Sequence, residues 1–86
     1  MYPPVIKVLP LTDYQLQLTF QNGEEGIFDM KPYLSLPIFQ PLNDLLMFNK
    51  VRVCFDTIAW EGDIDIDPET LYNGCEKQVA SISAFA

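Results

Sequence analysis

The chain has 86 residues, of which 49% are hydrophobic and 20% charged, so it makes one globular domain with a modest core and is not a disordered chain. Its formal net charge is −7, which argues against direct binding to nucleic acids or to anionic membranes. There is no apolar run of the ~20 residues that cross a bilayer and no signal peptide, and we therefore expect a cytoplasmic protein.

The first two expected elements are strands. Residues 5–9 form a short apolar run that Pro10 closes, and residues 11–13 have the composition of a turn. From Tyr14 to Phe20, apolar residues alternate with polar ones, which is the period of two of a half-buried strand.

A hairpin is expected directly after this strand. Asn22-Gly23 tolerates positive φ at both central positions of a type I′ turn, so it predicts a tight connection to a return strand over residues 24–29. Gly26 within the return strand indicates a bulge or a bend.

Three prolines rule out a single long helix between residues 31 and 48, because proline removes a backbone donor and clashes with the preceding turn. Short helical turns that begin at the prolines are expected instead, with an apolar side that covers one face of the sheet. The residues near helical spacing are Leu36, Phe39, Leu42, Leu45 and Leu46. Residues 51–55 and 57–60 then predict two further strands joined by a very tight turn.

A short helix is expected after Asp67, which can accept a free backbone N–H as its N-cap. Pro68 suits the first helical position, and Glu69 favours the positive end of the helix dipole. The helix should end near Gly74, which can adopt the left-handed conformation of a helix terminus.

Together these elements predict an α+β domain over residues 1–75. Its sheet should be small and mostly antiparallel, with roughly four to five strands and short helices that cover one face. Residues 76–86 form a C-terminal tail, extended or helical, which either packs on the domain or joins two copies. Its apolar residues are the candidate partner-binding residues: Val79, Ile82 and Phe85.

The sequence contains no catalytic constellation. Histidine is absent, and there is no Gly-rich phosphate loop and no nucleophile elbow. Cys54 and Cys75 are not spaced as a zinc pair, and both are expected to be structural thiols, with Cys54 in the core. Trp60 is expected to anchor the core. We therefore predict a non-enzymatic protein that uses no cofactor.

Acidic residues occupy every second position after Trp60: Glu61, Asp63, Asp65, Asp67 and Glu69. On an extended segment they share one face, with Ile64 and Ile66 on the other. A calcium-binding EF-hand is excluded, because Pro68 and Gly74 stand where it needs glycine and glutamate. A solvated strand face followed by a helix cap accounts for most of the carboxylates. A divalent-cation or carboxylate-based site at Asp63, Asp65 and Asp67 is the alternative.

The order and spacing of several short motifs resemble a known family, the bacterial domain-of-unknown-function family 2442, over residues 4–74. The motifs are Pro10-Leu11, Asp13-Tyr14, Leu16-x-Leu-x-Phe20, Asn22-Gly23-Glu24, Phe28-Asp29, Phe39-x-Pro41-Leu42-x-Asp44, Phe48 and Trp60-x-Gly62-x-x-Asp65-x-x-Pro68-Glu69-x-Leu71-Tyr72. Glu61 departs from the proline that members often carry.

The resemblance implies a small α+β domain with no assigned activity and no established site residues. Some relatives carry a helix-turn-helix domain after this one, and others are encoded beside small toxin-like proteins of the ribonuclease type. The resemblance therefore implies an antitoxin-like or regulatory role. The leading hypothesis is a protein-interaction module for a basic protein partner. A homo-oligomer built through the C-terminal tail is a third hypothesis.

Overall fold

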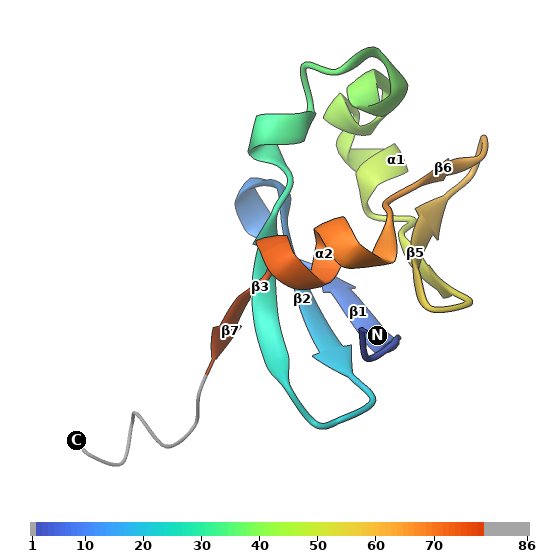
Figure 1. Cartoon of the computed structure of the whole chain (residues 1–86). Coiled ribbons are helices and arrows are strands. Elements are labelled where there is room, and N and C mark those ends of the chain that lie inside the picture. The colour runs from blue at the N-terminus through green and yellow to red at the C-terminus, as the bar shows by residue number, and fades with distance from the viewer. Residues whose placement is uncertain (1, 79–86) are drawn as a thin grey trace.

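The computed structural model describes residues 2–78 and has two antiparallel sheets with short helical segments between them (Figure 1). The first sheet has the strand order β1-β2-β3-β7, and the second has the order β4-β5-β6. The strands are β1 (Val5–Pro10), β2 (Gln15–Phe20), β3 (Glu25–Asp29), β4 (Arg52–Cys54), β5 (Thr57–Trp60), β6 (Ile64–Asp65) and β7 (Glu76–Gln78). The α+β class is confirmed, with the strands divided between two sheets.

Five short helical segments connect the strands. They are the 3-10 turns η1 (Thr12–Tyr14), η2 (Lys31–Tyr33) and η3 (Pro37–Asn43), and the α-helices α1 (Leu45–Phe48) and α2 (Pro68–Gly74). The prolines divide residues 31–48 as expected. The buried residues of η3 and α1 are Phe39, Leu42 and Phe48, whereas Leu45 and Leu46 are exposed. No helix within residues 2–78 has the length and apolar character needed to cross a membrane.

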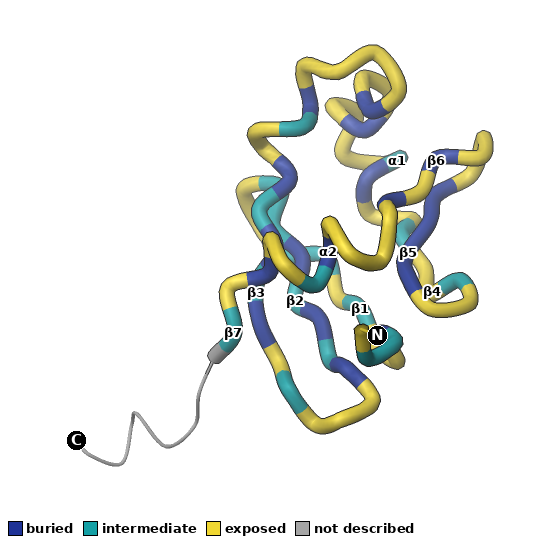
Figure 2. The backbone as a smooth tube through the Cα atoms, in the orientation of Figure 1, coloured by how far each residue is buried: buried dark blue, intermediate teal, exposed yellow. Residues whose placement is uncertain are grey.

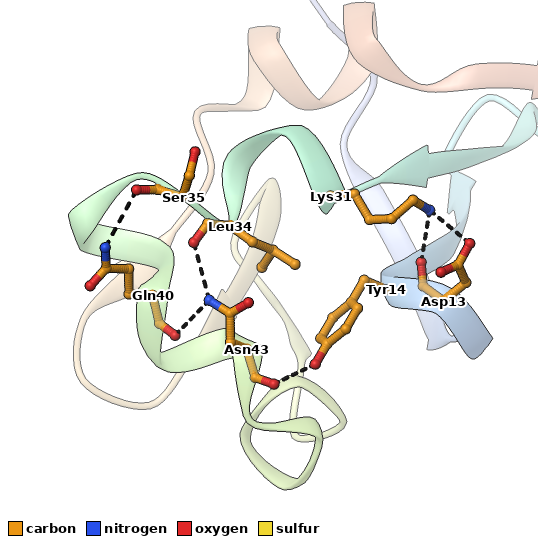
Figure 3. A pocket seen from close by; sticks show the side chains of 7 residues that line it. All are labelled: Asp13, Tyr14, Lys31, Leu34, Ser35, Gln40 and Asn43. Carbon is orange, nitrogen blue, oxygen red and sulfur yellow. Dashed lines mark hydrogen bonds and ion pairs between the residues drawn. The ribbon is translucent and has the colours of Figure 1, made fainter.

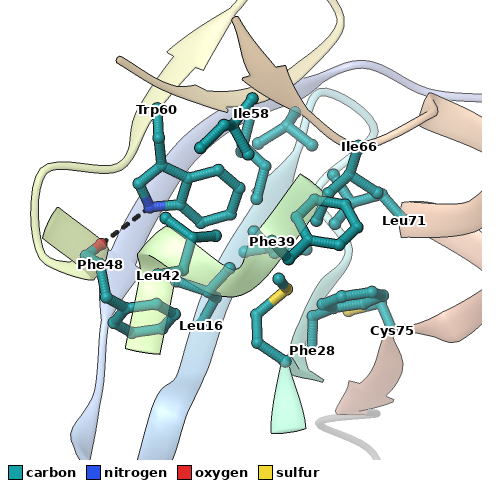
Figure 4. Close-up of a cluster of buried hydrophobic side chains, with 14 of the residues drawn as sticks. Leu16, Phe28, Phe39, Leu42, Phe48, Ile58, Trp60, Ile66, Leu71 and Cys75 are labelled. Carbon is teal, nitrogen blue, oxygen red and sulfur yellow. Dashed lines mark hydrogen bonds between the residues drawn. The ribbon is translucent and has the colours of Figure 1, made fainter. Parts of the chain in front are cut away.

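The core lies between the two sheets and the helical segments (Figures 2 and 4). Leu16, Leu18 and Phe20 of β2 are buried, and the polar residues between them are half-buried, so the predicted alternation is confirmed. Trp60 is fully buried, and its indole Nε1 donates a hydrogen bond of 2.9 Å to the backbone oxygen of Phe48. This bond ties β5 to the end of α1 inside the core.

The first hairpin turns over three residues, Gln21 to Gly23. The Gly23 N–H donates to the Phe20 oxygen (2.9 Å), and the Phe20 N–H donates to the Glu24 oxygen (2.8 Å). Gly23 has positive φ (93°) and Asn22 does not, so the predicted two-residue type I′ turn is wrong. The Asn22 side-chain oxygen instead accepts from the Glu24 N–H (3.0 Å), a local bond that supports the longer loop.

Two glycines allow close packing, and neither plays the role expected from the sequence. Gly74 lies within α2 without positive φ; a Cβ there would lie 2.8 Å from Cε1 of Phe28. Gly26 pairs with Lys77, and a Cβ at Gly26 would lie 2.6 Å from the backbone oxygen of Glu76. Gly26 therefore lets β7 approach β3, which brings the first residues of the predicted tail into the sheet.

The second hairpin turns over Phe55 and Asp56, since Cys54 pairs with Thr57. The expected tight connection between these strands is confirmed. β4 nevertheless ends at Cys54, because Phe55 has a positive φ of 54°, and its side chain is 95% exposed. The strand predicted over residues 51–55 is therefore shorter than expected, and it does not bury its alternate apolar residues, since Val53 is exposed and Cys54 is half-buried.

Candidate functional site

An open hollow of about 800 Å³ lies between η1, η2 and η3 (Figure 3). Its rim includes two consecutive residues with positive φ, Asp13 (62°) and Tyr14 (57°). Backbone strain of this kind gathers at functional sites, which makes the hollow a candidate. The lining residues are Asp13, Tyr14, Lys31, Leu34, Ser35, Gln40 and Asn43.

The charged groups of the hollow neutralise one another. Nζ of Lys31 lies 2.9 Å from Oδ2 of Asp13 and 3.1 Å from Oδ1 of Asp29, and it also donates to the Asp13 backbone oxygen at 3.0 Å. The hydrogen bond to Asp13 is the main reason why the pKa of Lys31 is raised. This cation is already shared between two carboxylates, so it offers little to an anionic ligand.

The remaining polar groups of the hollow hold the chain to itself. Nδ2 of Asn43 donates to the backbone oxygens of Leu34 (3.1 Å) and Gln40 (3.0 Å), and the Tyr14 hydroxyl donates to the Asn43 oxygen. Together with the Lys31 ion pairs, these bonds fasten η1 to η2 and η3. The positive φ of Asp13 and Tyr14 is thus held by tertiary contacts. The polar groups of the hollow have a structural role, since they join the three helical turns.

The five acidic residues after Trp60 are all exposed and are called here the acidic ridge: Glu61, Asp63, Asp65, Asp67 and Glu69. The predicted division into an acidic face and a core face is confirmed over residues 64–67, where Ile64 and Ile66 are each 5% exposed and Asp65 and Asp67 are exposed. The turn of residues 61–63 has positive φ at Gly62 (86°) and Asp63 (61°) and leads into β6. Within residues 2–78, no ridge carboxylate takes part in an ion pair.

The alternative cation site is not assembled. In the part of the chain that the structure describes, there is no group of three or more His, Cys, Asp or Glu residues that could hold a metal ion. Asp67 is instead the N-cap of α2, as predicted, and its Oδ2 accepts from the N–H groups of Glu69 (3.1 Å) and Thr70 (3.2 Å). Asp63, Asp65 and Asp67 are thus not gathered into such a group in the described residues.

The two cysteines differ in burial. Cys75 is 5% exposed, and burial is the main reason why its pKa rises to about 11, which fits a structural thiol. Cys54 is only half-buried, because it lies on the short edge strand β4; its expected place in the core is wrong.

A polar cluster fastens β7 and α2 to the first hairpin. The Tyr72 hydroxyl donates to Oε1 of Glu24, which is the main reason why the pKa of Glu24 is lowered and that of Tyr72 raised. Nζ of Lys77 lies 3.5 Å from the centre of the Tyr72 ring, a cation–π contact. These contacts are structural. The predicted partner-binding residues Val79, Ile82 and Phe85 lie outside the described residues.

Comparisons with known proteins are limited to the family level. No curated protein and no solved structure gives a significant match to the chain. The sequence model of the family described as "Protein of unknown function (DUF2442)" matches residues 5–77, which takes in all of the sheet strands up to the middle of β7. The chain therefore belongs to the DUF2442 family.

Proposed function

We propose that the protein is a non-enzymatic interaction module whose partner is a basic protein, with a regulatory, antitoxin-like role. The acidic ridge is the observation that carries this proposal. Its carboxylates face solvent from a backbone fixed by β6, by the N-cap of α2 and by two buried isoleucines. A rigid row of like charges attracts a complementary surface without first having to be ordered.

The ridge needs no ligand in order to exist. Where the ridge is extended, from Asp65 to Asp67, carboxylates two positions apart lie about 7 Å from each other, and their repulsion costs only about 0.6 kcal/mol in water. The free ridge is thus stable, and a cationic partner gains the attraction of several carboxylates together. Two of the five Lys and Arg residues are already engaged, since Lys31 is paired with Asp13 and Asp29 and Lys77 lies on Tyr72, and the net charge of the chain remains −7.

The test is purification of the full chain from its source organism at low salt, followed by identification of any stoichiometric companion. We expect one specific basic protein. Its affinity is then measured for the wild type and for the double variant Asp63→Asn and Asp65→Asn, which leaves the Asp67 N-cap intact. The matched control is Glu25→Gln with Glu76→Gln, two exposed carboxylates of the first sheet.

The ridge variant should weaken binding at least about tenfold and flatten its dependence on salt. The control variant, with the same change in net charge, should bind within about threefold of the wild type. Recovery of the chain alone, or equal losses in both variants, contradicts the proposal.

A further inference from the structure

Phe55 stands apart from the other aromatic residues of the protein. It is 95% exposed at the tip of the β4–β5 hairpin, and it holds a positive φ of 54°. An exposed aromatic ring and a left-handed backbone are both unfavourable for phenylalanine, and glycine or asparagine would avoid both. The ring is not part of the core cluster. The fold thus gains nothing visible from this side chain.

The tip that carries Phe55 is held in place on two sides. The Val5 N–H donates to the Asp56 oxygen (3.2 Å), which fastens the tip to β1. The buried Thr57 hydroxyl donates to the Ile66 oxygen (2.6 Å), which fastens the start of β5 to the segment before α2. Phe55 is therefore presented by a fixed backbone, and a fixed backbone reduces the entropy lost on binding.

A second apolar side chain is exposed beside the tip. The register of β1 against β2 shifts between Val5 and Lys7, a β-bulge that places Ile6 at the extra position, where it is 57% exposed. Bulges re-aim side chains in this way. Ile6 follows Val5, whose N–H is bonded to the residue after Phe55. The backbones that carry Ile6 and Phe55 are therefore neighbours, one residue away from the bonded pair Val5 and Asp56.

The charges around this region favour a cationic occupant. Asp56 adjoins Phe55, and Asp67 follows Ile66, whose carbonyl accepts from Thr57 next to the tip. These two exposed carboxylates outnumber the cation of the neighbouring strand β1, Lys7, whereas Asp65 and Arg52 both pair with Ala59, two residues further along β5 from Thr57. An apolar residue surrounded by carboxylates is complementary to an apolar pocket with a basic rim.

We infer that Phe55 is the apolar anchor of the protein's docking surface, and that it inserts into a pocket rimmed by Lys or Arg on the basic partner. The inference rests on the proposed function and adds to it a specific contact. The carboxylates of the acidic ridge accelerate association with the basic partner. The Phe55 ring becomes buried in the complex and slows dissociation, because central aromatic residues dominate interface energetics.

The experiment begins with photo-cross-linking in cells of the source organism. A benzophenone amino acid replaces Phe55 in the full chain; in a matched control it replaces Leu46 of α1, which is 75% exposed. We expect a basic protein to be cross-linked from position 55 and not from position 46. Binding kinetics of the purified partner are then measured for the wild type, Phe55→Ala and the Asp63→Asn, Asp65→Asn variant.

Phe55→Ala should lower the affinity at least tenfold through faster dissociation, with the salt dependence unchanged. Thermal unfolding of Phe55→Ala checks that the fold is intact. No adduct at position 55, an acidic partner, a second copy of this chain as the adduct, or unchanged dissociation in Phe55→Ala overturns the inference. If only the ridge variant weakens binding, the proposed function stands and the anchor is wrong; if neither variant does, both are wrong.

Discussion

Replacing Gly26 with alanine should detach β7 from the first sheet. The new Cβ would lie 2.6 Å from Sγ of Cys75, 2.6 Å from the Glu76 oxygen and 2.9 Å from the Lys77 Cα. Two of these atoms are backbone, so no change of rotamer relieves the overlap, and β7 has to move away from β3. The Gly26 backbone itself has ordinary negative φ, so the effect comes from space and not from conformation.

The expected loss follows from two contributions. Overpacking a filled site costs about 1–3 kcal/mol, and each ladder hydrogen bond lost with β7 adds about 1 kcal/mol. We therefore expect the free energy of unfolding to fall by about 2–4 kcal/mol. Urea unfolding followed by the fluorescence of Trp60, the single tryptophan, measures this loss, and hydrogen exchange reports the backbone amides of β7.

The control is Glu25→Ala, one residue earlier on the same strand, at an exposed position. It should change the free energy of unfolding by no more than about 0.5 kcal/mol. If Gly26→Ala unfolds at the same urea concentration as the wild type, with the β7 amides still protected, the pairing of Gly26 with Lys77 is incorrect.

The remaining predictions concern Asp67, the two cysteines and Phe55. Asp67→Ala should lower the free energy of unfolding by about 1 kcal/mol through loss of the α2 N-cap, whereas Asp67→Asn should nearly preserve it; urea unfolding separates the two. Iodoacetamide should label Cys54 in the native chain and leave Cys75 unlabelled until the chain unfolds. The raised pKa of Cys75 also means that the unfolded chain loses this proton first, so the contribution of Cys75 to stability should be constant below pH 9.0 and fall as pH rises from 9.0 to about 11, which a series of melts in that range, compared with Cys75→Ala, will detect. Phe55→Gly should raise the free energy of unfolding by about 0.5–1 kcal/mol, since the relief of a left-handed phenylalanine exceeds the added entropy of a glycine; a lower melting temperature would argue against strain at the tip.

Local chemistry made part of the fold predictable. The alternation of β2 and the cap at Asp67 depend on neighbouring residues alone, and both are present in the structure. The Asn22-Gly23 turn was placed correctly but given the wrong loop length, because the bond from Glu24 to the Asn22 side chain competes with the type I′ geometry. Local patterns located the turn and did not determine its backbone.

Features set by tertiary contacts were not predictable. The close packing of Gly74 on Phe28 joins residues far apart in sequence, and so does the approach of β7 to Gly26. In the sequence, Phe55 continues the alternation of Val51 and Val53, so nothing there indicates its positive φ. The acidic residues were identified from their spacing, whereas the fixed tip of the β4–β5 hairpin emerged only from hydrogen bonds between distant segments.

The place of β7 also sets the order in which the chain can fold as it is synthesised. β1, β2 and β3 form two local hairpins, which close soon after they leave the ribosome. The partner of the other edge of β3 is β7, which is translated only after the second sheet and α2. During this interval β3 presents a bare strand edge, the surface on which nascent chains pair wrongly with one another and which chaperones protect.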